Sequence, residues 1–286
     1  MYMVDNIYII TCDKTNWVLE ITIPLLEKYW TRPKKVNILG FSKPDVKLPD
    51  DYRFVSMRPE QISIDDWAQD VYNVMVDDPN ESIIFMLDDF LPLDYTNPDL
   101  IQMYYDKMQE DKNIVRCALG SDMQFLPHTV VEKGIDYDII ELEQSSNYRI
   151  STQPSIWRKD YLLQYLKRSE SPWHFETAVS PADGKRMIST IRKYSYCCMC
   201  ESAVSGRYPG KFNVLGMKFE DLKPLIDSNV LKEEDLQYGI HLGNVPQFKD
   251  YKYDFNLEVL KHYVDAKRLN EYYIRYHQNY MPKIVL

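Results

Sequence analysis

The sequence lacks any long apolar run. None of its hydrophobic stretches approaches the roughly 20 residues that a transmembrane helix needs, and its first residues show no basic region followed by an apolar one. We therefore expect no transmembrane segment and no secretory signal. Cysteine is also scarce: the five cysteines are odd in number and mostly lie in strand-like stretches, which favours free thiols over disulfides. Together these absences predict a cytoplasmic protein.

The sequence also has fewer basic than acidic residues. The chain has 34 Lys and Arg against 43 Asp and Glu, a formal net charge of −9. Nucleic acids are bound through clustered basic residues, so this balance argues against a nucleic-acid partner. There is no linker rich in Gly or Ser, no internal repeat and no low-complexity segment. A chain of 286 residues that is 45% hydrophobic can bury a sizeable core.

What the sequence does contain is an alternation of strand-like and helix-like segments. Alternation of this kind predicts an α/β fold with a mixed, mainly parallel central sheet flanked by helices, followed by a helical C-terminal tail. Short strands without an assigned order are expected between 123 and 149. The other predicted strands cover 6–11, 35–40, 53–56, 82–87, 114–119, 151–157 and 194–200. The predicted helices cover 16–29, 63–75, 99–109, 158–167, a segment starting near 171, 219–227, 233–239 and 256–280.

One predicted strand, 82–87, runs directly into two adjacent carboxylates, Asp88 and Asp89. Its continuous apolar sequence is typical of a strand buried on both faces. The acids then fall at its carboxyl end, where open α/β sheets bind ligands. Two such carboxylates repel each other unless a cation or a proton relieves them. A hard divalent ion held by these acids and by substrate phosphates would do so; the alternative is a polar strand end with solvated acids.

Two further stretches carry candidate chemistry. In the segment 171–176, Trp173 and Glu176 are three residues apart, which places them on neighbouring faces of a helix. The alternative is that Trp173 and Phe175 are core anchors and Glu176 is solvated. In the segment 153–158, Gln153 and a proline precede Trp157.

Taken in order, these motifs resemble those of GT-A type glycosyltransferases. The likeness is strongest to small soluble enzymes of bacterial polysaccharide clusters and of large DNA viruses such as chloroviruses, and for a viral protein the compartment would be the host cytoplasm. The resemblance covers about residues 6–215, which implies a catalytic domain over 1–218 and a helical extension over 219–286 packed on it. The motifs are Thr11-x-Asp13, Asp65-Asp66-Trp67-x-x-Asp70, Phe85-Met86-Leu87-Asp88-Asp89-Phe90, Gln153-Pro154-Ser155-Ile156-Trp157-Arg158 and Ser171-Pro172-Trp173-x-x-Glu176.

The resemblance implies a nucleotide-sugar donor, with a UDP-sugar as the first candidate, bound over the first half of the sheet. Thr11 and Asp13 would lie beside the base, and Asp70 near the nucleoside. Asp88 would face the ribose or the sugar, and Asp89 would ligate Mn²⁺ or Mg²⁺ that bridges the diphosphate. Because the two acids are adjacent rather than separated by one residue, either of them could hold the metal.

On the acceptor side, Glu176 would match the family's catalytic base in an inverting transfer to a carbohydrate hydroxyl. Gln153, Trp157 and Trp173 are assigned to the same side. The loop 205–211 is basic and rich in turn residues, and its Arg207 and Lys211 could close over the donor phosphate. The alternative for this loop is a solvated turn.

Two other functions stay open. A metal-dependent nucleotidyltransferase shares the sheet and the acid pair, but it would normally have a Gly-rich basic loop after the first strand, and residues 11–16 contain no glycine. The second is a non-catalytic sugar- or nucleotide-binding module in which Asp88 and Asp89 are structural. The oligomeric state is not determined by the sequence.

Overall fold

The computed structural model describes residues 5–120, 126–135, 137–177, 183–192, 212–214, 217–232, 236–237, 239–241 and 253–255. The chain divides into two units, Met1–Glu201 and Ser202–Leu286. None of the helices in the described part of the chain combines the length and the apolar composition that crossing a membrane requires.

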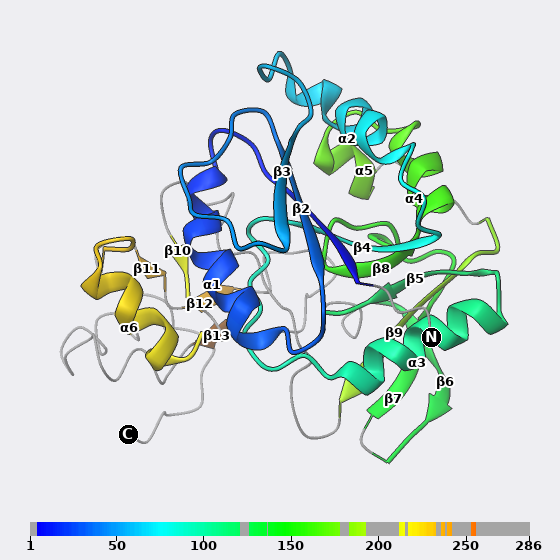
Figure 1. The fold of residues 1–286 in the computed structure, drawn as a ribbon. Coiled ribbons are helices and arrows are strands. Elements are labelled where there is room, and N and C mark those ends of the chain that lie inside the picture. The colour runs from blue at the N-terminus through cyan, green and yellow to red at the C-terminus, as the bar shows by residue number, and fades with distance from the viewer. Residues whose placement is uncertain are drawn as a thin grey trace. The chain divides into compact units, whose positions relative to one another are not determined.

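The first unit is built on a nine-stranded mixed sheet with the strand order β3-β2-β1-β4-β8-β5-β9-β7-β6 (Figure 1). The strands are β1 (Asn6–Ile10), β2 (Lys35–Gly40), β3 (Tyr52–Ser56), β4 (Ser82–Leu87), β5 (Ile114–Ala118), β6 (His128–Lys133), β7 (Tyr137–Leu142), β8 (Ser155–Arg158) and β9 (Arg186–Arg192). The helices are η1 (Asn16–Val18), α1 (Leu19–Tyr29), η2 (Ile64–Asp66), α2 (Trp67–Met75), α3 (Pro98–Glu110), α4 (Lys159–Leu166) and α5 (Pro172–Thr177).

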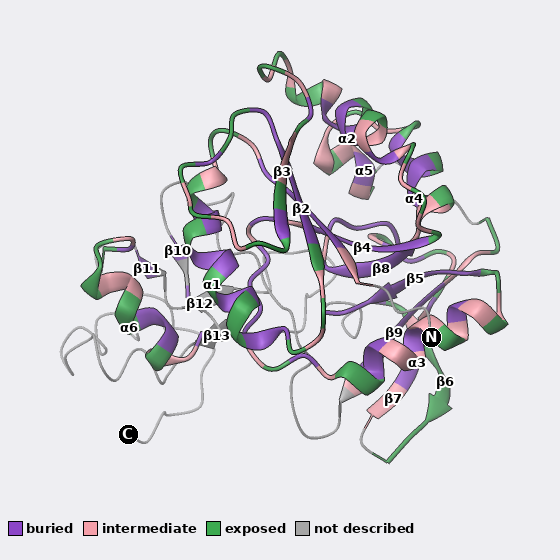
Figure 2. Cartoon of the chain, in the orientation of Figure 1, coloured by how far each residue is buried: buried purple, intermediate pink, exposed green. Residues whose placement is uncertain are grey.

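The helices cover both faces of this sheet. Because successive strand residues point to opposite faces, Ile7 and Ile9 of β1 pack with α1 and α3, whereas Tyr8 and Ile10 pack with α2, α4 and α5. Strand β4 divides its residues between the same two clusters. Its first five residues are buried, and Figure 2 shows that the strands at the middle of the sheet are buried along their length. The expected buried central strand is thus confirmed.

The sheet is parallel in its first part and largely antiparallel in its second. Strands β3, β2, β1 and β4 are mutually parallel, as the β-α-β-β-α-β pattern predicted. Beyond β4, strand β8 runs antiparallel to both of its neighbours, and β7 does the same. Only β5 and β9 are parallel in that part. The expected mixed α/β sheet flanked by helices is confirmed, but the sheet is not mainly parallel as predicted, because parallel and antiparallel pairings occur in equal share.

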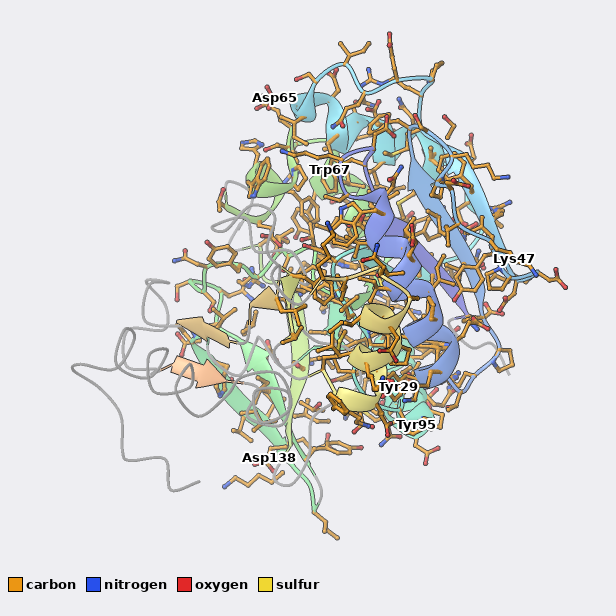
Figure 3. The ribbon with its side chains drawn as sticks, turned by 90° about the vertical axis from the view of Figure 1, so that its left-hand side faces the viewer. Tyr29, Lys47, Asp65, Trp67, Tyr95 and Asp138 are labelled. Carbon is orange, nitrogen blue, oxygen red and sulfur yellow. The ribbon has the colours of Figure 1, made fainter. Side chains whose placement is uncertain are left out.

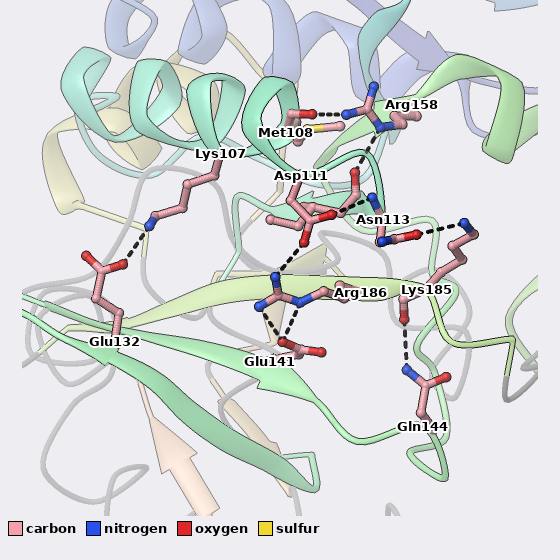
Figure 4. A network of polar contacts seen from close by, with 11 residues as sticks. Lys107, Met108, Asp111, Asn113, Glu132, Glu141, Gln144, Arg158, Lys185 and Arg186 are labelled. Atoms are coloured by element: carbon pink, nitrogen blue, oxygen red, sulfur yellow. Dashed lines mark hydrogen bonds and ion pairs between the residues drawn. The ribbon is translucent and has the colours of Figure 1, made fainter.

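Strand β9 was not predicted, and non-local contacts fix its place. Arg186 at its start forms ion pairs at 2.7 Å with Asp111, which follows α3, and with Glu141 of β7 (Figure 4). These pairs link segments that are distant in the sequence, so local patterning around 186–192 carries little trace of them.

The second unit contains three short described elements and a small hairpin. Strand β10 (Phe212–Asn213) pairs in parallel with β11 (Leu236–Gln237), and α6 (Phe219–Asp227) lies between them in the sequence. Strand β12 (Gly239–His241) pairs antiparallel with β13 (Tyr253–Phe255).

In this unit α6 confirms the helix predicted at 219–227. The helix predicted at 233–239 is wrong, because Leu236 and Gln237 pair with β10 and Gly239 begins β12. A backbone partner 24 residues away overrides the local helical preference of that segment. The predicted strand 194–200, the loop 205–211 and the tail 256–280 lie outside the described residues.

Candidate active site

The loops that follow the four parallel strands all leave from one edge of the sheet. Backbone hydrogen bonds continue the ladders past the strand ends: Thr11 N donates to Leu39 O over 2.8 Å, and Met57 N donates to Gly40 O over 2.8 Å. Asp88 N donates to Ile10 O over 3.0 Å. The carboxyl edge of a parallel sheet is where α/β folds place ligands. This edge therefore gathers the residues that follow β1, β2, β3 and β4.

Asp88 is buried at this edge and is held by threonine hydroxyls. Its Oδ2 accepts hydrogen bonds from Thr11 Oγ1 at 2.5 Å and from Thr15 Oγ1 at 2.9 Å. Its main-chain oxygen accepts a hydrogen bond from Thr22 Oγ1 at 2.6 Å. Thr11 is itself buried. Its hydroxyl is engaged with Asp88.

Burial raises the pKa of the Asp88 carboxyl, and the neighbouring charge of Asp89 raises it further. The threonine hydrogen bonds act in the opposite direction, because they stabilise the charged form. Asp88 and Asp89 are adjacent in the chain, and Asp88 is buried. The two carboxylates together would stabilise a bound cation. Asp89 is partly buried and less deeply so than Asp88, although its Oδ1 is shielded from solvent.

The side chains around Asp88 and Asp89 suit only an open kind of metal site. No group of three or more His, Cys, Asp or Glu within the described ranges could enclose a metal ion. Mg²⁺ and ions like it are commonly bound by one or two carboxylates, with water and substrate phosphates as the other ligands. Asp88 and Asp89 fit that open kind of site and do not fit a closed, all-protein cage.

Asp13 joins the loops after β1 and β2. Its carboxylate accepts hydrogen bonds from Ser42 N at 2.8 Å and from Ser42 Oγ at 3.1 Å. Asp13 is exposed, as a residue that contacts a nucleotide has to be. Ser42 was not identified from the sequence, although its position just beyond β2 on the same edge was a usable signal.

The carboxylate of Asp70 in α2 forms an ion pair with Arg58. Its Oδ2 lies 2.7 Å from Arg58 Nη2, and Asp66 Oδ2 lies 3.3 Å from the same nitrogen. Burial raises the pKa of Asp70, and the Arg58 charge opposes that effect. Figure 3 shows Asp65 and Trp67 where this helical segment begins. Sequence reasoning did not single out Arg58, which follows β3 and brings a positive charge to the ligand edge.

Glu176 of α5 is fixed to the segment that leads into β8. Its Oε1 accepts hydrogen bonds from Ser151 Oγ at 2.9 Å, Thr152 N at 2.7 Å and Thr152 Oγ1 at 2.8 Å. Strand β8 is antiparallel to β4, with Ser155 opposite Phe85. The residues before Ser155 therefore lie toward the edge where β4 ends. The fold thus brings Glu176 to the same edge as the acid pair.

An aromatic cluster holds α5 in that position. Phe175 is fully buried, and its ring centroid lies 6.0 Å from that of Trp67, 6.4 Å from Phe85 and 6.3 Å from Trp157. The indole of Trp157 is itself fully buried, so it belongs to the core and offers no surface to an acceptor. Of the anchors considered for α5, Phe175 is the one in the core; Trp173 is 67% exposed.

The remaining predicted residues are placed as follows. Gln153 is partly buried in the turn before β8, where its carbonyl accepts a hydrogen bond from Ser155 Oγ over 2.8 Å. Arg207 and Lys211 lie outside the described residues.

Comparisons with known proteins give distant structural matches. No protein-family model matches this chain, and neither does any curated protein. Among solved structures, the chain of S. aureus TarS 1-349 matches with a TM-score of 0.41 and 12% identity over 68% of this chain and 59% of that chain. The mannosyltransferase PcManGT of Pyrobaculum calidifontis, solved with GDP-Man and Mn²⁺, matches with a TM-score of 0.34 and 9% identity over 59% of this chain and 47% of that one. This chain therefore spans about half the length of the proteins it matches.

Proposed function

We propose that this protein is a metal-dependent glycosyltransferase that moves a sugar from a nucleotide-diphosphate donor to a hydroxyl of a carbohydrate acceptor, with inversion at the anomeric carbon. The proposal rests on the arrangement of three carboxylates at one edge of the sheet. The acid pair Asp88–Asp89 ends the central parallel strand, and a third carboxylate, that of Glu176, is held at the same edge by the segment before β8.

The donor occupies the carboxyl edge of β1, β2 and β4 in this proposal. Asp89, with Asp88 behind it, would hold Mn²⁺ or Mg²⁺. Such an ion, when bound, neutralises charge on the leaving diphosphate. Asp13 and the Arg58–Asp70 pair border the loops that would surround the nucleoside. A UDP-sugar is the first donor to test, and Arg207 and Lys211 stay the candidates for closing over its phosphates.

Glu176 would act as the general base. All of its contacts among the described residues go to Oε1, so Oε2 is the atom assigned to the proton. The acceptor oxygen forms a bond to the anomeric carbon while the bond from that carbon to the diphosphate oxygen breaks. The electron pair of the broken bond leaves with the diphosphate, and the hydroxyl proton passes to Glu176. The exposed Trp173, one helical turn away, offers an aromatic face to the acceptor sugar.

A panel of nucleotide sugars, incubated with the full chain and Mn²⁺, tests this proposal. We expect one donor to be consumed, with release of the nucleoside diphosphate, and we expect EDTA to stop the reaction. Release of pyrophosphate from a nucleoside triphosphate and a sugar phosphate would instead indicate a nucleotidyltransferase. Nucleotide binding without turnover of any donor, in the presence of simple glycan acceptors, would indicate a binding module. Either of these results would overturn the proposed transfer.

A further inference from the structure

Asp88 of the acid pair is held by hydrogen bonds to residues outside β4, the strand that it follows. The main-chain N–H of Asp88 donates to Ile10 O, its Oδ2 accepts from Thr11 and Thr15, and its main-chain oxygen accepts from Thr22. All four partners belong to the single segment that runs from the end of β1 into α1. The N–H, the carbonyl and one carboxylate oxygen of Asp88 are thus each fixed by residues more than 60 positions earlier in the chain.

Thr22 makes the contact with the most direct consequence for Asp89. Its hydroxyl lies 2.6 Å from Asp88 O and 3.2 Å from Val18 O, the carbonyl one turn back in the same helix. A hydroxyl has a single proton to donate, and the shorter distance assigns that proton to Asp88. Asp88 O and the nitrogen of Asp89 belong to one planar peptide unit. Fixing that oxygen therefore fixes the plane from which the Asp89 side chain extends.

We propose that Thr22 is a positioning residue for metal binding, which orients Asp89 through the Asp88–Asp89 peptide. The inference rests on the proposed function and extends it to a residue that touches neither metal nor substrate. It also assigns different tasks to the two acids. Oδ2 of Asp88 is engaged by two hydroxyls and ties β4 to the β1–α1 segment, whereas Asp89 presents its carboxylate to the ion.

A role confined to the helix is the competing explanation for Thr22. A threonine inside a helix often bonds back to the carbonyl four residues earlier, and that bond needs no distant partner. The buried position of Thr22 and its shorter bond to Asp88 favour the non-local role. The two explanations differ in what a substitution should do to metal affinity.

The test measures binding of Mn²⁺ alone to the full chain, without nucleotide, from the loss of the free-ion electron paramagnetic resonance signal. The variants are Thr22→Val, which removes the hydroxyl at nearly constant volume, and Thr22→Ser, which keeps it. If Thr22→Val does not fold, Thr22→Ala removes the same hydroxyl without an added methyl group. Sugar transfer by each variant is recorded alongside.

Thr96→Val is the matched control. Thr96 is also buried, and its hydroxyl donates to Tyr29 O over 3.0 Å, at the other end of α1. Thr22 and Tyr29 are about 10 Å apart along the helix axis, from the α-helical rise per residue. The control thus removes an equivalent bond between α1 and the chain after β4, but away from the acids.

We expect Thr22→Val to weaken Mn²⁺ binding about tenfold or more, in the range found for partners that orient metal ligands. Thr22→Ser and Thr96→Val should bind Mn²⁺ as the wild type does, even where Thr96→Val lowers the unfolding temperature. Equal Mn²⁺ affinity in Thr22→Val and the wild type would overturn the positioning role and leave the proposed function standing. A wild-type chain that binds no Mn²⁺ would also overturn the positioning role, whereas the donor panel with and without EDTA decides the proposed function separately.

Discussion

The main-chain N–H of Thr152 donates a hydrogen bond to Oε1 of Glu176 over 2.7 Å. This contact joins α5 to the turn before β8, across 24 residues of sequence, and so brings a carboxylate from a short helix to the edge where Asp88 and Asp89 lie. The proposed division into a donor side and an acceptor side depends on it.

Replacing Glu176 with Gln should keep this contact and remove the chemistry. The amide oxygen of Gln can still accept hydrogen bonds at the position of Oε1, but the amide cannot take a proton from the acceptor. We expect nucleotide binding to be unchanged and sugar transfer to fall about 100-fold or more, the usual contribution of a general base. Initial rates and equilibrium binding, measured on the same preparation, separate the two effects. Glu170→Gln, at an exposed position just before α5, is the control and should transfer normally; near-normal turnover by Glu176→Gln would exclude the base role.

Replacing Asp89 with Asn should abolish metal-dependent nucleotide binding. The substitution preserves the side-chain shape but removes the charge that a divalent ion requires. Affinity for a nucleoside diphosphate, titrated with and without Mn²⁺, provides the measurement. Asp99→Asn, an exposed substitution in the first turn of α3, should leave the Mn²⁺ effect intact. If Asp89→Asn binds nucleotide with the wild-type response to Mn²⁺, the metal is held elsewhere.

Metal should also stabilise the folded chain. An ion that binds only the native state raises the free energy of unfolding by about 2.7 kcal/mol when its concentration is 100 times its dissociation constant. We expect the thermal midpoint to rise with added Mn²⁺ and to return to its starting value with EDTA. The same titration on Asp89→Asn should show no rise, and a rise equal to that of the wild type would count against the assigned site.

Phe175 and Trp173 should behave oppositely although they are two residues apart. Phe175→Ala opens a cavity among Trp67, Phe85 and Trp157, and we expect it to cost about 3–5 kcal/mol of unfolding free energy. Trp173→Ala removes a side chain that is 67% exposed, so we expect a change within about 0.5 kcal/mol. Urea unfolding measures both.

For Trp173 we also expect a kinetic effect, which is independent of its effect on the free energy of unfolding. If its ring supports the acceptor, Trp173→Ala raises the acceptor KM and leaves donor hydrolysis unchanged. An unaltered acceptor KM would remove Trp173 from the acceptor side.

Lys34 lies at the end of the sheet opposite to the proposed site, so replacing it should affect stability and not sugar transfer. Its buried ammonium lies 2.7 Å from Glu27 and 3.3 Å from Asp51, and 5.6 Å from the centroid of the Tyr52 ring. Both acids are partly exposed, which screens the pairs, so we expect Lys34→Met to cost only about 1 kcal/mol. Sugar transfer should not change, because β2 and β3 begin here and the proposed site lies where they end. A loss of transfer larger than the loss of stability would place Lys34 in the function.

The sequence by itself determined the first part of the fold and the most prominent feature of the site. An apolar run ending in Asp88 and Asp89 specifies a buried strand with acids at its end, because burial and local patterning act on neighbouring residues. The start of the helix predicted at 63 is also local, because the Ser63 hydroxyl accepts a hydrogen bond from Asp65 N at the start of η2, as a capping residue does. Glu176 was singled out because it follows Trp173 by three residues in one short helical segment, and its role as a base was implied by the resemblance.

Only the tertiary structure decided which residues these elements meet. Strand β9, the pairing of Leu236 with Phe212 and the burial of Trp157 depend on partners far away in the sequence, and local preference carries little information about them. The hydrogen bond from Thr22 to Asp88 is of the same kind, since nothing in the pattern of α1 distinguishes that threonine from a core residue. The acid pair was therefore readable from the sequence, whereas its support by the β1–α1 segment follows from the way β1 and β4 lie side by side.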